Sequence, residues 1–182
     1  MKWITVLMAY FAISASAIAS SPNWQDDSKW ESWPTVGESS LSWLFFKLFN
    51  SELKSPTGEY EESTDITPHP MALSIIYHRD ISKEQLIQAT QEQWAYLGYN
   101  KTLQEEWILE LQEIYTSVQK GERLVYITDG ETGEMHSYRE SQAPVKLGEI
   151  RSESLNDAFL SIWLSPGTEY PRHRAKLIGN QK

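Results

Sequence analysis

The sequence contains no cysteine among its 182 residues. The chain can therefore form no disulfide and offers no thiolate to a metal ion. A domain without these cross-links depends on its hydrophobic core, and the composition provides for one, because 40% of the residues are hydrophobic and eight are tryptophan. The length fits a single domain with one core.

Basic residues are also few. Lys and Arg number 16 against 25 Asp and Glu, which gives a formal net charge of −9, and no basic cluster interrupts the acidic balance. An acidic domain repels phosphate backbones and anionic lipid surfaces. We therefore expect no nucleic-acid partner and no docking on a charged membrane surface.

Short motifs for catalysis and metal binding are missing as well. The four histidines show no HExxH or other tight ligand spacing, and no Gly-x-Ser-x-Gly elbow occurs. Gly130 and Gly133 lack the strand-to-helix context of a dinucleotide-binding loop and are typical of a hairpin. We predict no metal site, no cofactor and no catalytic residue.

One long uncharged run is present, near the start of the sequence. It follows Lys2 and leads into small residues, among which Ala17 and Ala19 fit the pattern that signal peptidase reads. The alternative, an uncleaved membrane anchor, needs about twenty apolar residues, and this run is shorter. We predict a signal peptide over residues 1–19, cleaved after Ala19, with no stable membrane insertion afterwards. An exported domain without cysteine suits the periplasm of a Gram-negative bacterium.

The remaining chain divides into an irregular segment, residues 20–35, and a folded domain, residues 36–182. The stretch from Val36 to Leu53 is dense in Phe, Trp and Leu, which favours a strand covered on both faces, with a buried helix as the alternative. Further strands are predicted over 71–78, 123–128, 134–139 and 145–150, and helices over 82–97, from Thr102 to Gly121, after Ser154 and over 171–177. This order predicts an α+β fold with a largely antiparallel sheet.

Alternation along the first predicted strand divides its large side chains between two faces. Trp43, Phe45 and Phe49 fall on one face, and Leu44, Phe46 and Leu48 on the other. Only one of these sets can line a cleft, and most of these aromatic residues are expected to fill the core.

Several separated patterns follow one another along residues 36–179. They are Val36-Gly37, Leu48-Phe49-x-x-x-Leu53, Ala72-Leu73-x-Ile75-x-Tyr77-x-Arg79-x-Ile81, Trp94, Leu97-Gly98, Trp107, Val118-x-x-Gly121-x-x-Leu124, Gly148-x-Ile150, Ala158-Phe159-x-x-Ile162-Trp163-Leu164 and Thr168-x-x-Pro171-x-x-Arg174-x-x-Leu177-Ile178-Gly179. In this order the chain resembles the bacterial chalcone isomerase-like family, exported relatives of plant chalcone isomerase. The C-terminal patterns are the most specific part of the resemblance.

The resemblance implies a chalcone isomerase-like open-faced β-sandwich, in which a mostly antiparallel sheet is layered with helices and a cleft lies between them. In the plant enzyme, an arginine on the long early strand stabilises the negative charge that develops when a phenolate attacks an enone. The matching stretch here is Ser39-Ser40-Leu41-Ser42, which has no arginine, and Lys47 lies too far along the strand. Chalcone isomerase activity is therefore not expected.

The leading hypothesis is a non-catalytic exported domain that binds a small hydrophobic or fatty-acid-like ligand in this cleft. The residues expected to line the cleft are Trp43, Phe45, Phe49, Tyr77, Arg79 and Tyr138. Two alternatives stay open. One is a periplasmic enzyme of unknown substrate that uses Tyr77, Arg79 or Tyr138 as polar groups, and the other is a module that binds another envelope protein. The place of Arg174 within a packing pattern favours a structural role for it.

Overall fold

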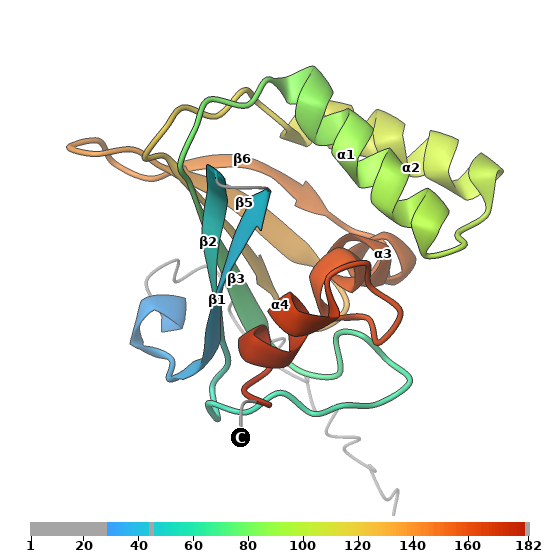
Figure 1. The fold of residues 1–182 in the computed structure, drawn as a ribbon, viewed down its shortest axis with the longest axis horizontal. Helices are drawn as coiled ribbons and strands as arrows, with labels where there is room; N and C mark the ends of the chain where they lie inside the picture. The colour runs from blue at the N-terminus through green and yellow to red at the C-terminus, as the bar shows by residue number, and fades with distance from the viewer. Residues whose placement is uncertain (1–28, 44–45, 181–182) are drawn as a thin grey trace, which may run out of the picture.

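The computed structural model describes residues 29–43 and 46–180, which form one sheet with four α-helices on one face (Figure 1). Six strands follow one another across the sheet in chain order, and every neighbouring pair is antiparallel. The strands are β1 (Thr35–Trp43), β2 (Phe46–Lys54), β3 (Met71–Tyr77), β4 (Arg123–Thr128), β5 (Gly133–Tyr138) and β6 (Val145–Ile150). The helices are the short 3-10 turn η1 (Lys29–Ser32), α1 (Lys83–Tyr96), α2 (Lys101–Ile114), α3 (Glu153–Leu164) and α4 (Pro171–Leu177). The predicted α+β class with an antiparallel sheet is thus confirmed.

Strand β3 lies near the middle of the sheet and is buried along its whole length except at Ile76. Leu73, Ile75 and Tyr77 face the helices and belong to the main core, whereas Ala72 faces the other side of the sheet. A strand covered on both faces needs apolar residues at successive positions, which explains the nearly continuous apolar sequence of β3.

The first predicted strand is wrong in one respect, because residues 36–53 form two strands rather than one. β1 and β2 are an antiparallel hairpin in which Trp43 pairs with Phe46. The two residues between the strands, Leu44 and Phe45, are apolar and give none of the Gly, Asn or Asp signals by which a tight turn is usually recognised.

The helices begin and end close to their predicted bounds, with three corrections. α1 has the predicted capping box, in which the Ser82 N–H donates to Gln85 Oε1 at 2.9 Å and the Gln85 N–H donates to Ser82 Oγ at 3.3 Å. α2 is capped by Asn100 rather than Thr102, and α3 by Ser152 rather than Ser154. α2 also ends at Ile114, because the chain becomes extended at the next residue and later pairs with Ile81 through Val118.

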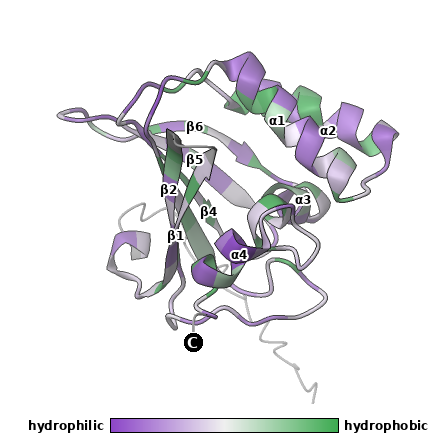
Figure 2. Ribbon diagram, in the orientation of Figure 1, coloured by the Kyte–Doolittle hydropathy of each residue, from purple (hydrophilic) through white to green (hydrophobic). Residues whose placement is uncertain are grey.

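The helix layer packs on the sheet unevenly. α2 and α3 contact β6, and α4 contacts β1 and β2, whereas α1 packs mainly against α2 and α3. α1 is anchored by Trp94, which is fully buried, donates from Nε1 to Ala158 O at 2.7 Å, and lies edge-on to Trp107 with ring centroids 5.4 Å apart. Figure 2 shows hydrophilic and hydrophobic stretches alternating along α1 and α2.

The opposite face of the sheet carries a smaller cluster. Trp30 of η1 is 3% exposed and packs there against Ala72 and Val125. The described part of the predicted irregular segment therefore contains a helical turn that is packed on the sheet, and β1 begins one residue before the predicted domain boundary. The predicted signal peptide lies outside the described residues. Within the described ranges, no helix combines the length and the apolar composition needed to cross a bilayer.

Candidate ligand pocket

A pocket of about 230 Å³ lies between the helix-facing side of the sheet and helices α1 and α3. It forms because α1 rests on its neighbouring helices and is not packed tightly onto the middle strands. Its lining is mainly aliphatic and aromatic: Leu41, Leu48, Phe49, Leu73, Ile75, Tyr77, Ile81, Gln85, Leu86, Ala89, Thr90, Glu92, Gln93, Tyr115, Leu124, Tyr126, Met135, Phe159, Ile162, Trp163 and Tyr170.

Three adjacent strands supply the aromatic side chains on the sheet side. Phe49 of β2 pairs with Tyr77 of β3, and their ring centroids are 6.1 Å apart. Tyr126 of β4 pairs with Leu73 of β3, four residues along the strand from Tyr77, and also lines the pocket. Because side chains two residues apart point to the same face of a strand, the alternation of β2, β3 and β4 places all three rings in one surface.

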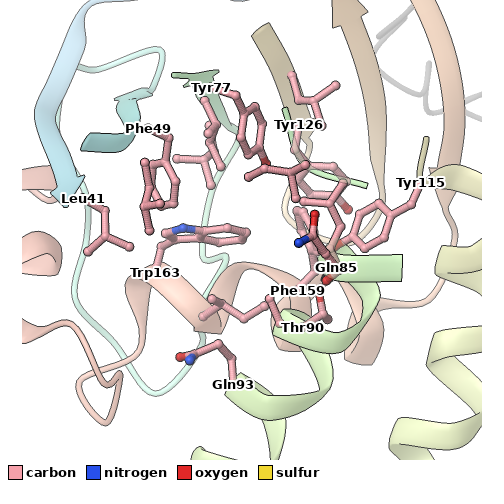
Figure 3. A pocket seen from close by; sticks show the side chains of 18 of the residues that line it. Leu41, Phe49, Tyr77, Gln85, Thr90, Gln93, Tyr115, Tyr126, Phe159 and Trp163 are labelled. Carbon is pink, nitrogen blue, oxygen red and sulfur yellow. Dashed lines mark hydrogen bonds between the residues drawn. The ribbon is translucent and has the colours of Figure 1, made fainter. Parts of the chain in front are cut away.

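Helix α3 supplies the opposite wall. Phe159 and Trp163 are four residues apart, so they lie on one face of the helix, and their ring centroids are 5.3 Å apart. Phe159 also packs on Tyr126 with centroids 4.6 Å apart. Figure 3 shows Trp163 and Phe159 between the sheet residues Phe49 and Tyr77 and the α1 residues Thr90 and Gln93.

The tyrosines of the pocket are neutral hydroxyls. Burial raises the pKa of Tyr115 to about 12, although its hydrogen bond with Thr90 opposes this effect, and burial also raises the pKa of Tyr77 and Tyr126 above the usual value. Thr90 Oγ1 donates to Leu86 O at 2.9 Å, so the Tyr115 hydroxyl donates to Thr90 Oγ1 across 3.0 Å. The Tyr126 hydroxyl donates to Asn156 Oδ1 at 2.7 Å. The Tyr77 hydroxyl, by contrast, has no hydrogen-bond partner within the described part of the chain.

Gln93 of α1 is held in one orientation. Its Nε2 donates to Glu169 Oε2 at 2.7 Å and to the Tyr170 hydroxyl at 3.3 Å. A carboxylate accepts hydrogen bonds and does not donate them, so this pairing fixes the amide nitrogen toward Glu169. Gln93 Oε1 is buried and has no hydrogen-bond partner among the described residues.

The pocket has an acidic electrostatic environment. Apart from the neutral tyrosines, the ionisable side chain among its described lining residues is Glu92, and none of these residues is Lys, Arg or His. Glu169 lies beside Gln93 and, with Glu92, contributes after burial to the raised pKa of Tyr170. The arrangement therefore favours uncharged, mainly apolar molecules.

The structure distributes the six predicted cleft residues in different ways. Phe49 and Tyr77 line the pocket. Arg79 is exposed beyond the end of β3 and is not one of the described lining residues. Phe45 lies outside the described residues, and Trp43 ends β1 with its side chain outside the described part.

Tyr138 lies on the opposite face of the sheet, away from the pocket. Its hydroxyl accepts a hydrogen bond from Trp30 Nε1 at 3.3 Å, and the Arg123 guanidinium lies 4.5 Å from its ring centroid. Adjacent residues alternate between faces along β5, and Met135 is the β5 residue that lines the pocket. Tyr138 cannot share its face, because the two residues are three positions apart.

Several lining residues were not assigned to the cleft from sequence. Tyr126, Phe159 and Trp163 were placed on the correct strand or helix, but no local pattern indicates which helix faces which strand. Tyr115 was not predicted to line the cleft because the predicted helix was too long. In the structure Tyr115 follows the end of α2.

Arg174 has the structural contacts that its sequence context favours. Its Nε donates to Leu164 O at 2.6 Å, and its guanidinium pairs with Glu62 Oε2 at 2.6 Å. It thereby ties α4 to the end of α3 and to the loop between β2 and β3.

Comparisons with known proteins support the fold. No family model matches the sequence. An uncharacterised protein of Haemophilus influenzae is 24% identical over 150 residues, covering 82% of this chain and 70% of that protein. The crystal structure of a fatty-acid binding protein of Arabidopsis thaliana superposes with a TM-score of 0.58 and 11% sequence identity, covering 82% of this chain and 88% of the other. The chain therefore has the chalcone isomerase-like open-faced β-sandwich fold expected from its sequence patterns.

Proposed function

We propose that this protein is an exported, non-catalytic binding protein for a small hydrophobic or fatty-acid-like ligand. The observation that carries the proposal is the pocket between the sheet and α1 and α3, which is lined mainly by aliphatic and aromatic side chains. Concave, mostly apolar pockets with a few polar groups are the usual form of small-molecule sites. The fatty-acid binding protein of Arabidopsis that shares the fold supports the same class of ligand.

The volume of the pocket sets the scale of the ligand. A dry apolar cavity of about 150 Å³ binds benzene, which has six carbon atoms. By the same ratio, a pocket of about 230 Å³ takes roughly nine carbon atoms. A medium-length acyl chain or a compact aromatic molecule fits this range.

The non-catalytic part of the proposal rests on β1. The strand carries Ser39, Ser40 and Ser42 around Leu41, and Leu41 lines the pocket. A serine hydroxyl cannot supply the delocalised positive charge that the arginine of the plant enzyme directs at a developing oxyanion.

Ligand binding is tested with 1-aminonaphthalene, an uncharged dye of about ten carbon atoms whose emission shifts to shorter wavelength in apolar surroundings. We expect saturable binding of one dye per chain, and an Ala89→Phe substitution should weaken it at least tenfold because the new ring fills part of the pocket. Ala95→Phe is the matched control, since Ala95 lies on the same helix but is not among the described lining residues. Absence of saturable binding, or equal loss in both variants, would refute the proposed pocket.

Export is tested separately by expressing the full chain with a C-terminal tag in a Gram-negative host. The periplasmic fraction should contain a protein that begins at Ser20, as measured by intact mass. Recovery of the protein only from the cytoplasm, with residues 1–19 still attached, would contradict this part of the proposal.

A further inference from the structure

We propose that the pocket selects an uncharged amphiphile, with a hydroxyl or carbonyl group at its polar end, over a fatty-acid carboxylate. This inference rests on the proposed function and specifies the chemical class of its ligand. It follows from the polar groups of the pocket rather than from its apolar walls.

The first argument is the charge around the pocket. A carboxylate that leaves water needs a cation or several hydrogen-bond donors, and an unpaired buried charge costs several kcal/mol. The described lining residues include no Lys, Arg or His, whereas Glu92 lines the pocket and Glu169 lies next to it. Both glutamates are exposed, so solvent weakens their repulsion of an anion, and the absence of a cation from the described lining is the main obstacle to a carboxylate.

The second argument concerns the donors that remain free. Tyr115 and Tyr126 already donate their hydroxyl protons to Thr90 and Asn156. Tyr77 is the pocket tyrosine whose hydroxyl has no partner within the described residues, and Figure 3 shows its side chain pointing from the sheet into the pocket. The amide nitrogen of Gln85, whose Oε1 accepts from the Ser82 N–H, is a second free donor of the described lining. Two neutral donors can bind an alcohol or carbonyl oxygen, but they supply no positive charge to replace the hydration of a carboxylate.

The third argument is the fixed orientation of Gln93. Because Glu169 and Tyr170 hold its amide nitrogen, this residue offers the pocket no free donor on that side. Its Oε1 is buried and is an acceptor, so Gln93 offers a carboxylate no hydrogen bond.

A fatty acid therefore enters this site only as its neutral, protonated form. Desolvation raises the pKa of a carboxyl group because it disfavours the charged form. The apparent affinity for an acid should consequently fall as pH rises above about 5, whereas the affinity for an alcohol of the same length should not change.

The test measures displacement of bound 1-aminonaphthalene by 1-decanol and by decanoate. At pH 7.5 we expect 1-decanol to displace half of the dye at a concentration at least tenfold lower than decanoate does. Lowering the pH to 5.0 should bring the two concentrations closer together. Tyr77→Phe should raise the 1-decanol concentration about fivefold through loss of one hydrogen bond. Tyr96→Phe should change nothing, because Tyr96 is an exposed residue of α1.

The outcomes separate the two proposals. If the dye does not bind, the proposed function fails. If the dye binds but decanoate displaces it as effectively as 1-decanol at pH 7.5, or 1-decanol does not displace it, the selection of an uncharged ligand is overturned. Lys47 has its side chain outside the described part of the chain, so Lys47→Ala is included. Decanoate binding that this variant abolishes would identify a cation that pairs with the acid and would likewise overturn the inference.

Discussion

Ser51 and His173 form a buried hydrogen bond that joins β2 to α4. Ser51 Oγ and His173 Nε2 are 3.0 Å apart, and the two residues are 3% and 5% exposed. Burial lowers the pKa of His173 to about 4, because a charged imidazole is disfavoured away from water. The Ser40 backbone acts in the opposite direction but is a smaller effect than burial.

The lowered pKa makes folding stability depend on pH. Between about pH 6.5 and 4 the unfolded chain binds a proton at this histidine and the folded chain does not. The contribution of His173 to the free energy of unfolding is therefore complete above pH 6.5 and is lost as the pH falls toward 4. The loss is on the order of 3 kcal/mol. We predict that His173→Asn reduces the change in unfolding free energy between pH 7 and pH 4, as measured by urea denaturation.

His69→Asn serves as the control for this measurement, because His69 lies in the loop between β2 and β3. The prediction fails if His173→Asn shows the same pH dependence as the unmodified protein.

At the scale of elements, the contact between β1 and α4 depends on Gly37. A Cβ atom at this position would lie 2.2 Å from Lys176 O and 2.6 Å from Leu177 O. Both neighbours are backbone atoms that cannot rotate away, so the helix would have to move off the hairpin.

We therefore predict that Gly37→Ala lowers the unfolding free energy by about 2–3 kcal/mol or more. Gly167→Ala is the matched control, because its nearest contacts would be 3.6 Å from Ser165 Oγ and 3.8 Å from Leu97 Cδ2, which are ordinary distances. Urea denaturation of both variants checks the difference, and similar midpoints would show that α4 adapts to the added methyl group.

The bounds of an element could be predicted from the sequence where residues at its ends favour or stop that structure. β6 and α4 were predicted with the correct bounds, and α4 begins at Pro171 and is followed by Gly179, residues that start and stop helices for known steric reasons. The β1–β2 hairpin was not predicted, because Leu44 and Phe45 continue the apolar pattern across its turn. The pocket could be predicted only where a local pattern was enough. β-strand alternation indicated Phe49, but the placement of Phe159 and Trp163 opposite it depends on the tertiary arrangement.

At the scale of the whole molecule, two proteins with the same fold need not catalyse the same reaction. The chalcone isomerase-like fold provides a cleft, but catalysis needs a cation directed at the developing oxyanion, and the matching stretch of β1 has serines instead. We predict that purified residues 20–182 convert chalcone to flavanone no faster than the spontaneous reaction in buffer. The loss of chalcone absorbance is followed with and without the protein at the same pH. A rate well above the spontaneous one would require a different catalytic group in the pocket.

The packing of α4 on β1 also bears on the order of events during synthesis. β1 emerges early, but its cover, α4, is the last helix of the described chain. Until residues 171–177 have been made, Ser51 lacks its histidine and the backbone at Gly37 lacks the helix against which it fits. Contacts between segments so far apart in sequence form late. The growing chain therefore cannot complete the packing around β1 until the last described helix has been made.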